Sequence, residues 1–141
     1  EIKVRYFDSS YLGEHRFTIE YFGYSAYVYY TVIEAFSGVC GNPLRWKFDV
    51  ESRTLELFGG NRMYNYNMGA NAPWYEFRDL IKTVKFSSPI SVIGEDAFKD
   101  CDQIEAVYYR GSILSWRRIT GDKEQFGDAK LYIQNKLHNL H

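Results

Sequence analysis

Residues 90–101, ISVIGEDAFKDC, decide how this chain is interpreted. A single glycine, Gly94, lies in the middle of this stretch. The apolar residues around it are Ile90, Val92, Ile93, Ala97, Phe98 and Cys101. A glycine beside acids and a thiol is compatible with a catalytic loop. The same apolar pattern is equally compatible with one unit of a repeated scaffold, and the sequence on either side separates the two interpretations.

Short apolar pairs with one residue between them recur on both sides of this stretch. They are Leu55-x-Leu57, Val84-x-Phe86, Val107-x-Tyr109 and Leu131-x-Ile133, at intervals of 29, 23 and 24 residues. The middle match extends over six positions, because IKTVKF (81–86) aligns with IEAVYY (104–109). Periods in the twenties are typical of a leucine-rich solenoid, in which each turn adds one short parallel strand. Each turn then buries one strand face against its neighbour.

The repeat is predicted to end after residue 110. When residues 90–101 are compared with the residues 23 positions later in the chain, the two sequences do not match. Residues 111–120, GSILSWRRIT, fit a helical cap instead, with Ser112 as its N-cap. Ile113 and Trp116 share one face of this helix because they are three residues apart.

The segment VIGEDAFKDCDQIEAVYY (92–109) resembles the BspA-type leucine-rich repeat, Ile-Gly-x-x-Ala-Phe-x-x-Cys-x-x-Leu-x-x-Val. The matching positions, with Ile in place of Leu, are Ile93, Gly94, Ala97, Phe98, Cys101, Ile104 and Val107. The segments before and after it look like the capping segments of that family, so the resemblance covers about residues 38–133. Only one complete repeat is present, whereas the family usually carries many. Ser115 stands where the cap helix often has an acidic residue, which puts the capping box in doubt.

The first part of the chain alternates as an antiparallel hairpin over residues 16–34. Its turn is predicted at FGYS (22–25) with Gly23 at the first central position, as a type II′ turn requires. A shorter alternation over residues 2–6 predicts another strand. Residues 6–34 are similar to the final strands of a bacterial immunoglobulin-like domain, which would make this chain a fragment of a longer protein.

Between these two resemblances the sequence predicts mainly strands and loops. Residues 36–43, rich in Gly and Pro, indicate a boundary, and residues 44–57 alternate as a second hairpin. Residues 59–73 predict an irregular loop, and Pro73 opens a short helical turn.

The expected fold is therefore mostly β. It is a short leucine-rich-repeat solenoid with parallel strands, short helical turns and a C-terminal helical cap, preceded by an antiparallel hairpin module. The predicted domains are 1–35, a partial immunoglobulin-like module, and 36–141, a BspA-like domain with caps at both ends.

The composition is that of a globular protein. Of the 141 residues, 45% are hydrophobic and 25% are charged, and the formal net charge is −1. The absence of a basic stripe argues against a nucleic-acid partner, and no apolar run has the length that membrane insertion requires. Aromatic residues reach 18%, with 13 Tyr, which favours strand packing or outward platforms for sugars or proteins.

The groups that suggest chemistry have simpler explanations. Cys101 lies at helical spacing from Ala97 and Phe98, which favours a buried small hydrophobe over a nucleophile, and a disulfide to Cys40 stays open. Gly94 fits a tight bend and not a phosphate loop, because no phosphate-binding motif surrounds it.

Two polar clusters are also explained without chemistry. The acids of residues 95–102 lack the order of a calcium loop and predict a solvated edge. His138 and His141 lack a third metal ligand, and their terminal position predicts disorder or a loose helix. No metal, cofactor or catalytic residue is expected, and the protein is not expected to be an enzyme.

The remaining candidate site is the outward face of the predicted parallel strands. The residue between two core positions points the opposite way along a strand. The expected partner-binding residues, which such a face would bring side by side, are Glu56, Lys85, Tyr108, Tyr132 and the nearby Arg110. The alternative is an ordinary solvated sheet face.

The BspA resemblance implies a secreted or cell-surface adhesion protein of a bacterium that binds host proteins or neighbouring cells. The expected ligand is an extracellular protein or glycan. A second hypothesis is carbohydrate binding as an accessory module, through Tyr108, Tyr132 and the Tyr/Asn loop 63–67. A third is a structural spacer that binds nothing.

Overall fold

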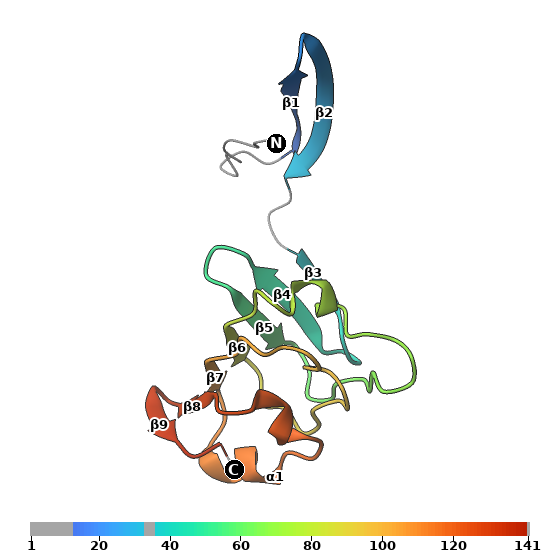
Figure 1. Cartoon of the computed structure of the whole chain (residues 1–141). Helices are drawn as coiled ribbons and strands as arrows, with labels where there is room; N and C mark the ends of the chain where they lie inside the picture. The colour runs from blue at the N-terminus through green and yellow to red at the C-terminus, as the bar shows by residue number, and fades with distance from the viewer. Residues whose placement is uncertain (1–12, 33–35, 141) are drawn as a thin grey trace. The chain divides into compact units, whose positions relative to one another are not determined.

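The structure is a computed structural model that describes residues 13–32 and 36–140, with side chains described for 22–27 and 36–140 (Figure 1). The chain divides into two compact units, Glu1–Glu34 and Ala35–His141, which we describe separately. The strand predicted over residues 2–6 lies outside the described residues.

The described part of the first unit forms an antiparallel hairpin of β1 (Gly13–Tyr21) and β2 (Tyr24–Val32). Its turn is Phe22-Gly23, with positive φ angles of 45° and 79° and with Tyr21 opposite Tyr24. The predicted type II′ turn is therefore wrong. Positive φ at both central residues is the type I′ conformation, whose twist matches a two-residue hairpin and which prefers Gly at the second position. The immunoglobulin-like assignment stays a prediction, because a hairpin is common to many folds.

The second unit is built on a seven-stranded sheet in the order β3-β4-β5-β6-β7-β8-β9 (Figure 1). Its strands are β3 (Phe36–Val39), β4 (Arg45–Asp49), β5 (Thr54–Phe58), β6 (Thr83–Phe86), β7 (Ala106–Tyr109), β8 (Lys130–Ile133) and β9 (Lys136–His138). Strands β5 to β8 run parallel, and the pairs at both ends of the sheet are antiparallel. The prediction of a mostly β fold with parallel strands is confirmed.

The core follows the period of two within each parallel strand. The apolar pairs recognised in the sequence are in register, so that Leu55, Val84, Val107 and Leu131 form one buried column across β5 to β8. All four are 0% exposed. A second buried column contains Leu57, Phe86, Tyr109 and Ile133. Burying one face of each strand against the neighbouring coils is what holds a solenoid together.

The side of the coils away from these strands carries an aromatic column. The rings of Trp74 and Phe98 are 5.6 Å apart, and those of Phe98 and Phe126 are 4.7 Å apart. Trp74 precedes the 3₁₀ helix η1 (Tyr75–Phe77), and Phe126 ends the 3₁₀ helix η2 (Lys123–Phe126). The indole N–H of Trp74 donates to the carbonyl of Ala97 at 2.8 Å. Successive coils are therefore joined by ring packing as well as by strand pairing.

The prediction that the repeat ends after residue 110 is wrong. Strand β8 continues the parallel register, and Thr120 pairs in parallel with Val92 on another side of the coil. The coil has nearly the same total length as the preceding one, but the segment between its two paired sides is longer. Val92 lies six positions after Phe86, whereas Thr120 lies eleven positions after Tyr109. A comparison at one fixed shift therefore loses the match inside a coil that is still present.

The longer segment between Tyr109 and Thr120 contains helix α1 (Ile113–Arg118), whose Trp116 is buried. Strands β8 and β9 follow it, so its role as a terminal cap stays a prediction. The doubt about the capping box is removed. The Ser115 N–H donates to Ser112 Oγ at 3.1 Å, and the Ser112 N–H donates to Ser115 Oγ at 2.8 Å. A hydroxyl oxygen accepts the cap N–H, as a carboxylate does in the usual box.

Both antiparallel ends of the sheet contain strands that the sequence did not predict. Residues 36–39, expected as a boundary, form β3 against β4. His138, expected in a disordered or loosely helical end, lies in β9. The turn before β9 is Gln134-Asn135, again with two positive φ angles, of 51° and 61°. His141 lies outside the described residues.

Candidate binding cleft on the outer strand face

The parallel register brings the predicted outward residues into one row. Glu56 pairs with Lys85, Lys85 with Tyr108, and Tyr108 with Tyr132. Each lies between two buried positions of its strand, and each is at least partly exposed. The antiparallel neighbours extend the row to Lys47 at one end and Leu137 at the other. The strand alternation therefore presents acid, base and two aromatic rings side by side, as predicted.

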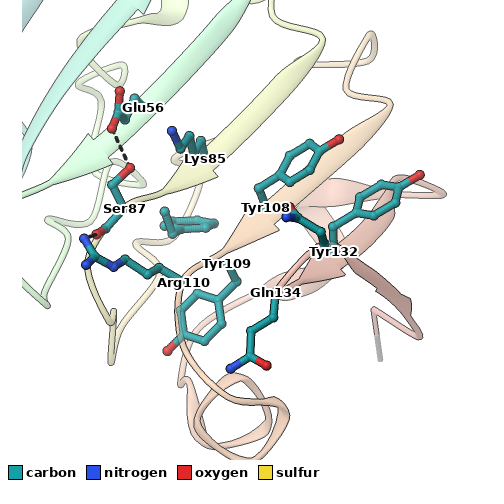
Figure 2. A pocket seen from close by; sticks show the side chains of 10 residues that line it. Glu56, Lys85, Ser87, Tyr108, Tyr109, Arg110, Tyr132 and Gln134 are labelled. Carbon is teal, nitrogen blue, oxygen red and sulfur yellow. Dashed lines mark hydrogen bonds between the residues drawn. The ribbon is translucent and has the colours of Figure 1, made fainter.

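The two tyrosines of the row stack on each other. Their ring centroids are 4.9 Å apart and their planes differ by 14°. Figure 2 shows both rings projecting in the same direction with the hydroxyl groups outermost. Each ring therefore turns one face to its neighbour, and the pair presents its ring edges and O–H groups outward.

Glu56 is held as a carboxylate by its neighbours. Lys47 Nζ lies 3.1 Å from one oxygen, and the Ser87 hydroxyl donates to the other (Figure 2). Burial alone would raise the pKa of Glu56, but the hydrogen bonds from Ser87 and Lys47 and the charges of Lys47 and Lys85 together lower it. The negative charge of Glu56 is thus largely satisfied within the protein.

This arrangement predicts a pH-dependent stability. A group whose folded pKa is depressed stabilises the fold above its ordinary pKa, here 4.5, and loses that contribution as the pH falls through the folded value. Near pH 7 we expect the free energy of unfolding of wild type to be higher than that of Glu56→Gln. This difference should disappear towards about pH 3. Urea titrations across this range measure it, with Glu76→Gln as the surface control. A gap that is the same at both ends of the range would contradict the assignment.

A cleft of about 410 Å³ lies over this row and the ends of its strands. Its lining residues are Glu56, Lys85, Phe86, Ser87, Tyr108, Tyr109, Arg110, Tyr132, Gln134 and Asn135. All five residues of the predicted site, including Arg110, therefore line one cleft (Figure 2). Three polar residues were missed, Ser87, Gln134 and Asn135. Ser87 and Gln134 each follow the last residue of a parallel strand, as Arg110 does, so extending the repeat by one position would have found them.

Lys85 and Arg110 are the two cations of the cleft, and the charge of Lys85 helps to lower the pKa of the neighbouring Glu56. Among the described residues, neither Lys85 nor Arg110 forms a salt bridge; the ion pairs are Lys47–Glu56 and Lys82–Glu105. Arg110 Nη1 lies 3.4 Å from the carbonyl oxygen of Ser87, which directs the guanidinium along the rim. The cleft therefore combines aromatic edges with a net positive charge.

The cysteines have no catalytic geometry. Both are free and buried, so the Cys40–Cys101 disulfide that was left open is not formed. Burial raises the pKa of each thiol to about 12, which keeps them protonated. Within the described ranges, no three His, Cys, Asp or Glu side chains are grouped as metal ligands. No helix in that part of the chain is long and apolar enough to cross a membrane.

The Tyr/Asn loop 63–67 does not join the cleft. Met63 is buried, and the partly buried Tyr66 lies 6.1 Å from Trp74, ring centroid to ring centroid. Asn67 donates to Glu95, which does not line the cleft. None of residues 63–67 is among those that line the cleft. The structure therefore separates the loop from the tyrosine pair, contrary to the combined carbohydrate site considered from the sequence.

One short parallel strand per coil, stacked cores and helical turns between strands define a leucine-rich-repeat-like fold. The solved structure of a leucine-rich repeat protein from Eubacterium ventriosum is similar to this chain, with a TM-score of 0.54 and 28% sequence identity. The similarity covers 70% of this chain and 25% of that protein, so the match spans about a quarter of its length. No family model and no curated protein matches the chain.

Proposed function

We propose that this chain is a non-catalytic protein-binding module of a bacterial leucine-rich-repeat protein of BspA type. We further propose that it acts in adhesion at the cell surface or outside the cell. The observation that carries the proposal is the cleft, in which Tyr108 and Tyr132 form a stacked, partly exposed pair beside Lys85 and Arg110. Tyrosine and arginine are enriched where protein interfaces gain most of their binding energy. Solenoids commonly use the extended face of their strands for this purpose.

The ring geometry favours a protein ligand over a carbohydrate. A sugar ring gains most when it lies flat on an exposed aromatic face. Here each tyrosine turns one face to the other ring at 4.9 Å. Loop 63–67, the other aromatic element of the carbohydrate hypothesis, lies outside the cleft. The outward edges and hydroxyls suit the mixed polar and apolar surface of a peptide chain.

The proposal predicts a loss of binding without a loss of folding. The double variant Tyr108→Ser/Tyr132→Ser should weaken binding to a protein ligand about tenfold or more. Its free energy of unfolding should fall by only about 1 kcal/mol, because an exposed cross-strand pair contributes little. Arrays of extracellular-matrix proteins and of glycans identify the ligand, and titration of wild type and variant gives the affinities.

Tyr64→Ser is the matched control, because Tyr64 is 51% exposed and lies outside the cleft. Binding to glycans alone would replace the proposal with the carbohydrate hypothesis. Normal folding with no binding on either array would leave the spacer hypothesis. Unchanged affinity of the double variant for a protein ligand would remove this face from the site.

A further inference from the structure

We propose that the ligand segment recognised by this cleft is acidic and extended, with carboxylates that pair with Lys85 and Arg110 while its chain crosses Tyr108 and Tyr132. This inference rests on the proposed protein-binding function and specifies the chemistry of the partner. It follows from three observations on the charge, the ring orientation and the spacing of the row.

The first observation is that the two cations of the cleft have no salt-bridge partner among the described residues. Lys85 and Arg110 form no salt bridge with a carboxylate of the described residues, whereas the cleft's only acid, Glu56, is already bound by Lys47 and Ser87. An incoming carboxylate therefore meets two cations that form no salt bridge, and one acid that Lys47 and Ser87 already bind and whose charge Lys85 also offsets. Such complementarity sets the specificity and the rate of association more than it sets raw affinity.

The second observation is the orientation of the tyrosines. An aromatic ring is electronegative on its faces and electropositive at its edge. Because Tyr108 and Tyr132 stack, the faces between them are covered, and the ring edges and O–H donors project outward (Figure 2). The side-chain amides of Gln134 and Asn135 add N–H donors at the same end. Donors and positive edges together favour a ligand that supplies acceptors and negative charge.

The third observation is the spacing. Lys85 and Tyr132 are separated by two strand intervals in the sheet, which is about 10 Å. Three residues of an extended chain cover about the same length. An extended segment can therefore place a carboxylate near Lys85 while its following residues pass over the tyrosine edges.

The experiment uses the full chain and three fluorescent peptides of equal length, with alternating Glu and Ala, Gln and Ala, or Lys and Ala. Fluorescence anisotropy should show binding of the Glu/Ala peptide only, with an affinity that falls as salt is raised from about 50 to about 300 mM. Lys85→Gln/Arg110→Gln should weaken this binding about tenfold or more. Lys99→Gln/Arg117→Gln removes two exposed cations outside the cleft and should leave the affinity within about twofold.

The other outcomes overturn the inference in distinguishable ways. Equal binding of the Glu/Ala and Gln/Ala peptides would show that charge does not select the ligand. Binding of heparin that requires Lys85 and Arg110, with no peptide bound, would assign the cleft to sulfated glycans. If the acidic peptide fails but a protein from the arrays binds through Tyr108 and Tyr132, this inference fails and the proposed function stands. If nothing binds through the tyrosines, both fail.

Discussion

Replacing Phe98 by Ala is expected to lower the free energy of unfolding by about 3–5 kcal/mol. Phe98 is 1% exposed and lies between Trp74 and Phe126 in the aromatic column. Truncation removes the buried ring and leaves a cavity bounded by two large side chains. Trp74 and Phe126 belong to the coils on either side of Phe98, so they cannot close the gap without shifting whole turns of the solenoid.

Urea or guanidinium titration measures this effect through the unfolding midpoint at constant slope. Tyr64→Ala is the control, because this aromatic side chain is 51% exposed and its loss should cost less than about 1 kcal/mol. A loss of less than about 1 kcal/mol for Phe98→Ala as well would contradict the stacked-coil architecture, since the ring would then make no core contacts.

The second large effect is expected at Gly94, the glycine that interrupts the apolar run of residues 90–101. A Cβ atom at this position would overlap the carbonyl oxygen of Tyr64 and lie 2.8 Å from its carbonyl carbon. The obstacle is backbone and not the end of a flexible side chain, so two coils must separate to admit a methyl group. We expect Gly94→Ala to cost more than about 3 kcal/mol, above the usual range for overpacking.

Gly69→Ala is the matched control. No atom lies within 4 Å of a Cβ built at Gly69, whose φ is +86°, so this change should cost only about 1–2 kcal/mol of backbone strain. Thermal unfolding followed by circular dichroism compares the two variants with wild type. Equal midpoints for Gly94→Ala and Gly69→Ala would show that the close approach of coils at Tyr64 does not determine stability.

The parallel strands could be predicted because their spacing is fixed by the coil. Leu55, Val84, Val107 and Leu131 pair directly in the sheet, so the recurrence of the apolar pair in each coil gives the register. The course of the chain between strands is not fixed in this way. The coil that contains α1 divides its residues differently from the preceding coil, and a constant shift could not follow it. Strand β9 was missed because it is three residues long and only its pairing to β8 defines it.

The sequence could predict which strand residues belong to the candidate site, but not how their side chains are arranged. Strand alternation is enough to place Lys85, Tyr108 and Tyr132 on one face. It does not determine that the two rings stack at 14°, because side-chain torsions depend on neighbours that the pattern leaves unspecified. It also does not reveal that Ser87 binds Glu56, since this contact joins residues 31 positions apart in the chain.

Each parallel strand carries one outward residue between two inward ones. The inward residues therefore determine the fold, and the outward residue determines what the surface can bind. The inward neighbours across the four coils are all apolar or aromatic, whereas the outward positions hold an acid, a base and two tyrosines. A change at an outward position alters the chemistry offered to a partner while the buried columns stay intact. Evolution can therefore rewrite what this surface recognises one coil at a time, without having to find a new way to fold.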